Sequence, residues 1–241
     1  MTRPDRFETI GFVGGTGPQG RGLALRWARA GHAVLVGSRS REKAEDVVAG
    51  LAGRVGEGAE LLPATNEEAV ERAEVVVVTV PYEAQAATLP PLRAAVDGKV
   101  VVNVVNPMAF DEQGPKAVPV AAGSAAEECA EIWPEGRVVS AFHDVPARRL
   151  LRVQESVECD VLICSDHPNA AHQVAHLAAR IPGMWGVYCG PLRNSAHLEN
   201  MTPVLLFVNR TYGVHAGIKI DGVERDDASL HAKPAGQGTG W

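Results

Sequence analysis

Three glycines near the start of the chain have the spacing of a turn that binds the pyrophosphate of a dinucleotide. Gly15, Gly17 and Gly20 form the pattern GxGxxG directly after the apolar run at residues 9–13 and at the start of a helical pattern. The first glycine of such a turn permits the tight bend, the second lets the backbone approach the pyrophosphate, and the third lets the helix pack closely on the strand. The free amides at the helix start attract the phosphates. The turn therefore predicts dinucleotide binding, and a glycine turn without a ligand is the alternative.

The end of the second apolar run indicates which dinucleotide is bound. After residues 33–37 the chain continues with Ser38 and Arg39, where an NAD-specific protein usually has an acid that holds the ribose 2′-hydroxyl. Ser38, Arg39 and, one helical turn later, Lys43 are instead suited to a 2′-phosphate, because they offer a planar guanidinium and a compact ammonium charge. The pattern favours NADP over NAD. The alternative is that Arg39 and Lys43 lie only on a solvated helix start.

The elements that must position these residues alternate between strands and helices along the chain. Strand patterns lie at residues 9–13, 33–37, 75–80, 99–105, 138–141, 161–164 and 186–189, and helical patterns at 18–30, 40–52, 67–73, 83–96, 124–132, 168–180 and 195–213. This alternation is typical of βαβ units. Four consecutive valines, residues 75–78, indicate a strand covered on both faces. The sequence therefore predicts an α/β fold with a doubly wound, mostly parallel Rossmann sheet.

The same patterns suggest how the chain is divided. We expect an NADP-binding Rossmann domain over residues 7–190, with its core ending near residue 145 and extended by a strand–helix–strand unit. A small helical C-terminal cap is expected over residues 191–220. Residues 221–241 combine glycines, Pro234 and scattered charges without periodicity, so they are expected to form a flexible tail or to lie on a partner.

Composition restricts the class of protein. Of 241 residues, 46% are hydrophobic and 22% are charged, which is the balance of a globular protein with a sizeable core. A formal charge of −6 and an aromatic content of 5% argue against a nucleic-acid partner. No apolar stretch approaches the roughly 18 residues that a membrane span requires. Residues 1–7 do not resemble a signal peptide, so we expect a cytoplasmic protein.

Other reactive residue types do not form a recognisable metal or hydrolytic site. Cys129, Cys159, Cys164 and Cys189 fit neither a CxxC motif nor a disulfide scaffold, and are expected to be small core or surface residues. His172 and His176 lie four residues apart, with His167 just before them, but no acid completes an HExxH pattern, so we expect no metal and solvent-facing histidines. Ser140 lies near His143 without a GxSxG elbow, which argues against hydrolysis.

Several longer segments, taken together with the glycine turn, resemble one known family. They lie at residues 14–24, 36–39, 78–83, 139–147, 190–195, 202–203 and 217–219. On these segments the chain resembles the NADPH-dependent coenzyme F-420 reductases, from about residue 10 to residue 220. It departs from the family at Asn106-Pro107-Met108, where a Pro-Leu or Asn-Pro-Leu turn is expected, and in the extra residues after Ile220.

The resemblance implies reversible hydride transfer between NADPH and an 8-hydroxy-5-deazaflavin, coenzyme F-420, in a homodimer whose small C-terminal helical part covers the active site. Such a transfer needs two flat rings stacked closely, so the protein must mainly orient them and exclude water. The NADP contacts of the family, together with the glycine turn, correspond to Gly15, Thr16, Gly17, Pro18, Gln19, Gly20, Ser38, Arg39, Lys43, Val80, Asn106 and Ala147.

The resemblance also suggests where the deazaflavin binds. The candidate substrate-binding residues are His143, Val145, Pro146, Asn194, Ser195 and Leu198. His143 is the catalytic candidate, expected to hydrogen-bond a ring carbonyl or to stabilise negative charge on the pyrimidine part; the alternative is a histidine that only fixes the backbone turn. The candidates for the anionic phosphate and glutamyl tail are Arg148, Arg149, Arg152 and Arg193, which are otherwise ordinary solvated arginines.

Two other functions remain open. An NADP-dependent imine or β-hydroxyacid dehydrogenase has a similar N-terminal half, but such enzymes usually carry a long helical substrate domain, and only about 30 residues follow Gly190 before the tail. The second of these functions is that of a non-catalytic NADPH-binding protein. The helical repeat Met201, Leu205 and Val208 is expected to form either core or a dimer interface.

Overall fold

Residues 8–225 are described by the structure, a computed structural model. The expectations for residues 1–7 and for the tail from residue 226 to residue 241 lie outside the described residues. Between residues 8 and 225, no helix is both long enough and apolar enough to cross a membrane.

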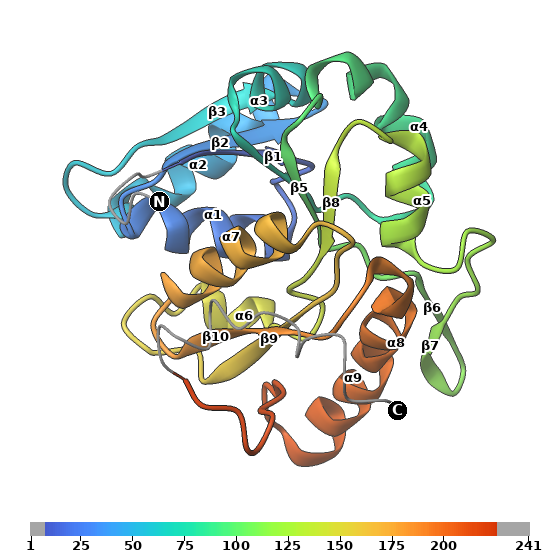
Figure 1. Ribbon diagram of the computed structural model, residues 1–241. Helices are drawn as coiled ribbons and strands as arrows, with labels where there is room; N and C mark the ends of the chain where they lie inside the picture. Colours follow the sequence, from blue (N-terminus) through green and yellow to red (C-terminus); the bar gives the residue numbers. More distant parts are fainter. Residues whose placement is uncertain (1–7, 226–241) are drawn as a thin grey trace.

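The centre of the fold is a six-stranded sheet in which neighbouring strands run parallel. In spatial order it consists of β3 (Leu61–Thr65), β2 (Ala33–Ser38), β1 (Thr9–Val13), β4 (Val75–Val78), β5 (Val100–Asn103) and β8 (Arg137–Ser140) (Figure 1). The chain moves outward from β1 through β2 to β3 and then returns to place β4 on the other side of β1. This doubly wound arrangement confirms the predicted fold class. The order reverses between β1 and β4, which is the point where such sheets bind ligands.

Helices cover both faces of the sheet. One face carries α1 (Pro18–Arg29), α2 (Arg41–Val55) and α7 (Pro168–Ala179), and the other carries α3 (Asn66–Arg72), α4 (Tyr82–Thr88), the 3-10 helix η1 (Pro90–Ala95) and α5 (Ala125–Ile132). The valines of β4 divide between these faces: Val75 and Val77 pack with the first set, and Val76 and Val78 with the second. All four are buried, as their consecutive apolar pattern predicted.

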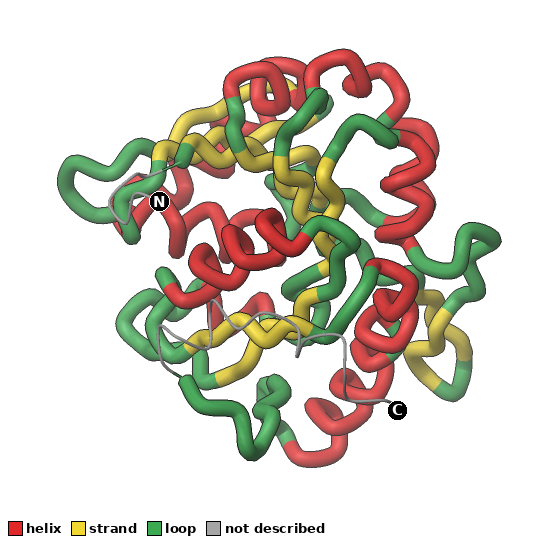
Figure 2. The backbone as a smooth tube through the Cα atoms, in the orientation of Figure 1, coloured by secondary structure: helices red, strands yellow, loops and turns green. Residues whose placement is uncertain are grey.

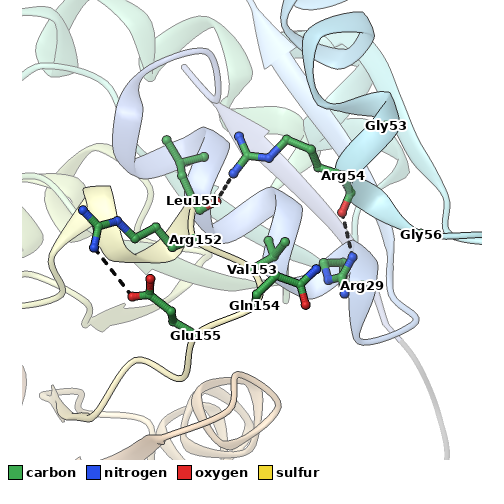
Figure 3. Close-up of a pocket in the computed structure, with 9 residues that line it drawn as sticks. All are labelled: Arg29, Gly53, Arg54, Gly56, Leu151, Arg152, Val153, Gln154 and Glu155. Carbon is green, nitrogen blue, oxygen red and sulfur yellow. Dashed lines mark hydrogen bonds and ion pairs between the residues drawn. The ribbon is translucent and has the colours of Figure 1, made fainter.

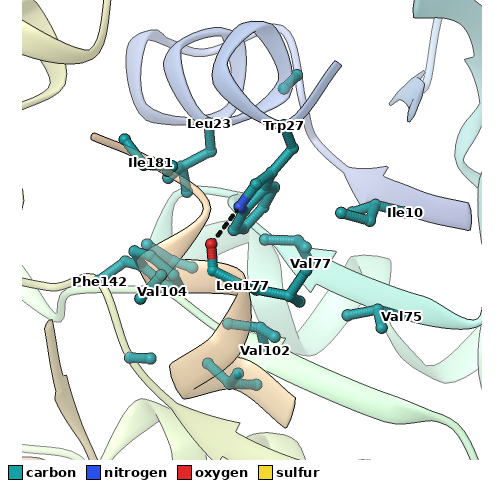
Figure 4. Packing of buried hydrophobic residues seen from close by; sticks show 14 of the residues in the cluster. Ile10, Leu23, Trp27, Val75, Val77, Val102, Val104, Phe142, Leu177 and Ile181 are labelled. Carbon is teal, nitrogen blue, oxygen red and sulfur yellow. Dashed lines mark hydrogen bonds between the residues drawn. The ribbon is translucent and has the colours of Figure 1, made fainter. Parts of the chain in front are cut away.

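Trp27 connects α1 to the C-terminal third of the chain. Its indole N–H donates to the carbonyl of Leu177 in α7 at 2.9 Å, and its ring packs edge-on against Phe142 with the centroids 5.4 Å apart (Figure 4). Trp27 and Phe142 are both buried. The loop that starts at Phe142 is therefore fixed against the helix that follows the glycine turn.

Strands β9 (Cys159–Ile163) and β10 (Met184–Tyr188) form a separate parallel pair, connected through α7. Backbone hydrogen bonds between Ser140 and Cys164, of 2.9 and 3.0 Å, join this pair to the end of β8. The strand–helix–strand unit expected after the core is therefore a second small sheet, which lies below the main sheet in Figure 1.

Short elements complete the C-terminal third. The 3-10 helix η2 (Leu192–Asn194), α8 (Ser195–Glu199) and α9 (Met201–Tyr212) follow one another, and α9 packs beside the hairpin of β6 (Met108–Asp111) and β7 (Gly114–Ala117) (Figures 1 and 2). The helix α6 (Ala147–Leu150) packs on α1. Residues 213–225, after α9, contain no helix or strand. They are held against β9 because Asp160 N donates to Ile218 O at 2.7 Å.

The structure differs from the expected elements in several places. The helix expected over residues 195–213 is divided into α8 and α9 at Asn200. Pro203 explains the break, because it has no N–H and its ring clashes with the carbonyl four residues earlier. The helix expected over residues 83–96 likewise ends at residue 88 before Pro90. Strand β3, the β6–β7 hairpin and α6 were not predicted.

Candidate functional site

The β1–α1 turn presents backbone amides rather than side chains at the start of α1. Gly17 is the N-cap residue, and no side chain caps this helix start. A Cβ atom on Gly15 would lie 2.7 Å from the Cβ of Phe12, and one on Gly20 would lie 2.7 Å from the Cα of Gly15. A Cβ atom on Gly17 would meet nothing within 4 Å. The fold thus requires Gly15 and Gly20, whereas Gly17 leaves open space in which a pyrophosphate can approach the amides.

Other NADP candidates come together at the same edge of the sheet. Ser38 ends β2, Val80 follows β4, and Asn106 follows β5, so all three lie at carboxyl ends of parallel strands. Val80 packs against the glycine turn itself, because a Cβ atom on Gly14 would lie 2.7 Å from its Cγ1. Ala147 is the first residue of α6, which packs on α1. These positions surround the switch point between β1 and β4.

The candidates for the 2′-phosphate lie together at the start of α2. Ser38 is buried and accepts a hydrogen bond from Ser40 N at 3.2 Å, and Ser40 caps the helix by accepting from Lys43 N at 3.3 Å. The side chains of Arg39 and Lys43 are exposed. Both cations are therefore accessible to a ligand at the end of β2.

The backbone of the loop after β8 is held by side chains from two helices, α1 and α9. Phe142 has a φ of 64°, and it is the only non-glycine residue between residues 8 and 225 with positive φ. Bulky residues rarely adopt this conformation. Gln19 of α1 donates from Nε2 to Phe142 O at 3.1 Å, and Thr202 of α9 donates from Oγ1 to His143 O at 3.1 Å. The loop is thereby tied both to the glycine turn and to the C-terminal helices.

The His143 side chain is used within the protein. Its Nε2 lies 2.8 Å from Ser140 Oγ and its Nδ1 lies 2.9 Å from Asn106 Oδ1. The ring is buried, and this burial lowers the pKa of His143 to about 3. With both nitrogens engaged and the ring neutral, the geometry favours the alternative in which His143 positions its neighbours. Ser140 is itself fully buried, so the Ser140–His143 contact does not form an accessible nucleophile.

The other deazaflavin candidates are mostly buried and bonded within the protein. Asn194 is half-buried and donates from Nδ2 to Cys189 O at 2.9 Å. Ser195 is buried and donates from Oγ to Leu192 O at 2.5 Å. Leu198 and Val145 are also buried, and Pro146 is half-buried. Of this set, Asn194 and Pro146 offer the most accessible surface.

Sequence reasoning missed a buried carboxylate that joins the two parts of the chain. The Oε atoms of Glu199 in α8 accept hydrogen bonds from Ala125 N at 2.9 Å and Ala126 N at 3.1 Å, at the start of α5. Burial raises the pKa of Glu199 to about 7, although the two amide bonds oppose this shift. Helical periodicity placed Glu199 in a helix, but its partners lie more than 70 residues away in the chain and leave no local signal.

A buried polar network, also missed, extends from α5 toward the nucleotide edge. Gln85 of α4 donates from Nε2 to Ala125 O and to Glu128 Oε1, both at 3.0 Å, and accepts from Asn103 Nδ2 at 2.9 Å. Tyr82 OH donates to Glu128 Oε2 at 3.1 Å. Because α4 begins directly after Val80, this network connects the end of β4 with the α5 start that Glu199 holds.

Of the arginines considered for the anionic tail of F-420, some are exposed to solvent and others bind within the protein. Arg148 and Arg193 are exposed, and Arg149 donates to Ser156 O at 3.2 Å. Arg149 and Arg152 line a cavity of about 380 Å³ together with Gly213, Val214 and His215.

A cavity of about 490 Å³ lies away from the nucleotide edge, where α1 and α2 end. Figure 3 shows that its arginines bind within the protein: Arg29 donates to Arg54 O at 2.7 Å, Arg54 donates to Leu151 O, and Arg152 lies 3.7 Å from Glu155. Arg29 is the last residue of α1, whereas the glycine turn is at the other end of that helix. This cavity is therefore no part of the candidate site.

The histidines and cysteines considered for a metal site lie on or beside the packed core. His172 and His176 are half-buried on α7 and thus less solvent-exposed than expected, and His167 is the exposed N-cap residue of this helix. Cys129, Cys159 and Cys164 are buried, Cys189 is half-buried, and all four are free thiols. Across the described part of the chain, no three His, Cys, Asp or Glu side chains gather as a metal site would require.

Solved structures share this fold at low sequence identity. A crystal structure of an Arthrobacter sp. FB24 protein, for which F-420-dependent NADP reduction has been suggested, matches with a TM-score of 0.77 and 21% identity over 89% of this chain and 99% of that chain. A Streptomyces aurantiacus imine reductase matches with a TM-score of 0.57 and 22% identity, over 83% of this chain but 61% of its own.

Sequence relatives agree on one family. The family model for coenzyme F-420-dependent NADP oxidoreductases matches residues 9–107. The F-420-dependent NADP reductase of Methanothermobacter thermautotrophicus is 41% identical over 88% of this chain and 94% of its own length. The reductase of that name from Methanocaldococcus jannaschii is 34% identical over 89% of this chain and 99% of its own. Identity at this level over nearly the whole of both chains shows that this protein belongs to the family of F-420-dependent NADP reductases.

Proposed function

We propose that this protein is an oxidoreductase that transfers a hydride reversibly between NADPH and the deazaflavin coenzyme F-420. The observation that carries the proposal is the hydrogen bond from Gln19 Nε2 to Phe142 O, which joins the glycine turn to the 142–146 loop. A nucleotide on the turn therefore lies beside the loop that is expected to hold the second ring. Family membership supports the identity of both coenzymes.

On the nucleotide side, the turn around Gly17 receives the pyrophosphate, and Arg39 and Lys43 receive the 2′-phosphate. The open space at Gly17 and the exposure of both cations support these roles. Val80 and Asn106 lie toward the nicotinamide end, at the carboxyl ends of β4 and β5.

On the deazaflavin side, the ring lies between the 143–146 loop and the segment that contains Asn194. His143 is a positioning residue in this proposal, because its two nitrogens are bonded to Ser140 and Asn106. We retain residues 191–220 as a cap over this site, held to the core through Glu199 and Thr202. The chain's own contribution is to orient two flat rings and to exclude water.

A homodimer is part of the proposal. Helix α9 buries only Pro203, although Val204, Leu205, Leu206, Phe207 and Val208 follow in sequence. Val204 is 50% exposed, and on the neighbouring hairpin Phe110 is 69% exposed. Contiguous apolar surface of this kind marks an interaction site. In an isologous dimer, the same face of a second copy covers this surface and removes it from water.

The activity is tested by incubating the purified protein with NADPH and oxidised F-420 and following the loss of the visible deazaflavin absorbance. We expect rapid loss with NADPH and little with NADH. If NADPH binds but the absorbance is stable, the protein binds NADPH without acting on F-420. If NADPH is instead consumed with cyclic imines, it is an imine reductase.

The dimer is tested by light scattering on the wild type and on Val204→Asp. We expect twice the monomer mass for the wild type and a monomer for the variant. Leu62→Asp is the matched control, since Leu62 is an exposed apolar residue on the distant strand β3. A monomeric wild type contradicts the proposed interface.

A further inference from the structure

One buried carboxyl group beside the candidate site lacks the bonds that burial normally demands. Asp144 is 4% exposed, and its Oδ1 has no hydrogen-bond partner among the described residues. Buried carboxylates are ordinarily paired or hydrogen-bonded, because desolvation of the charge is costly. Burial alone raises the pKa of Asp144 to about 7. The group can therefore exist in either protonation state near neutral pH.

Asp144 belongs to the 143–146 loop, one of the two segments that are expected to hold the deazaflavin. It follows His143 and precedes Val145 in the loop after β8. On its other side it acts electrostatically on Cys189, whose carbonyl holds the Asn194 side chain. A Cβ atom on Gly217 would lie 3.8 Å from the backbone carbonyl oxygen of Asp144, so the C-terminal segment passes close to the Asp144 backbone. The Asp144 side chain is buried and acts electrostatically on Cys159 as well as on Cys189.

The proposed reaction needs a group that exchanges a proton at this place. A hydride carries one proton and two electrons, so reduction of the neutral deazaflavin to its dihydro form also consumes one proton. We propose that Asp144 is the catalytic acid and base for this proton, exchanged with the pyrimidine ring nitrogen of F-420.

When the hydride reaches the deazaflavin carbon, the ring's electron pair moves to the pyrimidine nitrogen, which takes the proton from the Asp144 carboxyl. The O–H bond breaks and its electron pair stays on the carboxylate, which is reprotonated from water. In the reverse direction the carboxylate removes the proton from the same nitrogen while the hydride returns to NADP⁺.

The neighbouring groups do not replace Asp144 in this role. Burial raises the pKa of Cys159 to about 12 and also raises the pKa of Cys189, so both thiols are neutral. His143 is neutral because burial lowers its pKa to about 3. Besides Asp144, the charged groups that act on the Cys159 thiol are Arg149, Asp160 and Lys219. Burial also raises the pKa of Glu199 to about 7, but both of its carboxyl oxygens accept hydrogen bonds from the amides of Ala125 and Ala126. Among these groups Asp144 is then the one that changes charge near neutrality and has an oxygen without a hydrogen-bond partner in the described part of the chain.

The inference rests on the proposed function, and the test separates the two. Wild type and Asp144→Asn are assayed with NADPH and F-420 in both directions between pH 5 and pH 9. For wild type, kcat for F-420 reduction falls above about pH 7, and kcat for the reverse reaction rises over the same range. In Asp144→Asn, kcat is expected to become independent of pH in both directions and to fall about 100-fold. The NADPH dissociation constant should not change. A wild type inactive with F-420 contradicts the proposed function, whereas an active wild type with an unaffected variant contradicts only the role of Asp144.

Asp160→Asn is the matched control. Asp160 is also buried, but its carboxyl accepts hydrogen bonds from Arg225 and from the backbone amide of Ile220. Its replacement should lower the free energy of unfolding and leave the pH dependence of kcat unchanged in both directions. A change in the KM for F-420 with the limbs retained in Asp144→Asn overturns the inference. If Asp144→Asn does not fold, Asp144→Ser replaces it. Infrared titration of the wild type minus that of Asp144→Ser isolates this carboxyl from Glu199: a midpoint near pH 7 in the difference supports the role, and one near pH 4 overturns it.

Discussion

His143 Nδ1 lies 2.9 Å from Asn106 Oδ1, and this bond joins the loop after β8 to the end of β5. Because the amide oxygen accepts, Nδ1 carries the hydrogen, and Nε2 then accepts from the Ser140 hydroxyl at 2.8 Å. The loop expected to hold the deazaflavin is therefore coupled to a residue expected to contact NADP. A substitution at His143 should therefore affect the binding or reaction of both coenzymes.

His143→Ala is expected to lower kcat about 10-fold and to weaken NADPH binding by a smaller factor. It should also destabilise the protein by about 1–3 kcal/mol, because it leaves the buried Ser140 hydroxyl unpaired. Steady-state kinetics in both coenzymes and denaturant unfolding measure these effects. Since burial lowers the pKa of His143 to about 3, its removal should leave any pH limb between 5 and 9 unchanged. A limb that disappears in His143→Ala contradicts the assignment of a neutral, positioning histidine.

Gly17→Val should abolish NADPH binding without unfolding the protein. The Gly17 backbone, at φ −74° and ψ 168°, suits a β-branched residue, and a Cβ atom there meets nothing within 4 Å. The added side chain occupies the space that the pyrophosphate needs. Gly20→Ala is the contrasting variant, because its Cβ meets the Gly15 backbone at 2.7 Å and should lower the melting temperature. Micromolar NADPH binding by Gly17→Val, measured by calorimetry, means that the nucleotide lies elsewhere.

Arg39→Ala should weaken NADPH binding about 10- to 100-fold and leave NADH binding nearly unchanged, because a charge-assisted bond contributes roughly 1.5–3 kcal/mol. Arg41→Ala is the control: Arg41 lies two residues away but is paired with Glu68 at 2.8 Å. Equal losses for both nucleotides in Arg39→Ala contradict a 2′-phosphate contact.

The sequence predicted the elements that have strong local patterns and missed those that depend on distant contacts. Strand β1 was predicted with its observed bounds, and the valine run of β4 predicted burial on both faces. Strand β3 was missed because it contains Pro63 and pairs only with β2 at the sheet edge. The β6–β7 hairpin was missed because its exposed strands have no apolar alternation.

For the candidate site, the sequence proposed the positions, whereas the bonds between them come from the structure alone. The spacing of the glycines located the turn, yet only the structure separates Gly17 from the glycines that the fold itself requires. The sequence also brought His143 forward as a ligand contact, whereas its partners Asn106 and Ser140 lie on two different strand ends. Such contacts arise from tertiary packing and leave no trace in local spacing.

Glu199 provides a prediction about stability and pH. Its folded pKa is raised from 4.5 to about 7, mainly by burial, so folding favours the protonated form. The resulting stability is fully present below pH 4.5 and is lost as the pH rises to about 7. A shift of this size corresponds to about 3 kcal/mol.

Glu199→Gln removes the titrating group, so its free energy of unfolding should decline less than that of the wild type between pH 4.5 and 7. The difference between the two curves, measured by denaturant unfolding at constant ionic strength, should approach about 3 kcal/mol over this range. Glu131→Gln is the control, because Glu131 is exposed on α5, the helix whose start Glu199 holds. Its curve should run parallel to that of the wild type. A parallel curve for Glu199→Gln would mean that Glu199 titrates near 4.5 in the folded protein, as an accessible carboxylate does, and that the C-terminal cap is not held on α5 by a buried carboxyl.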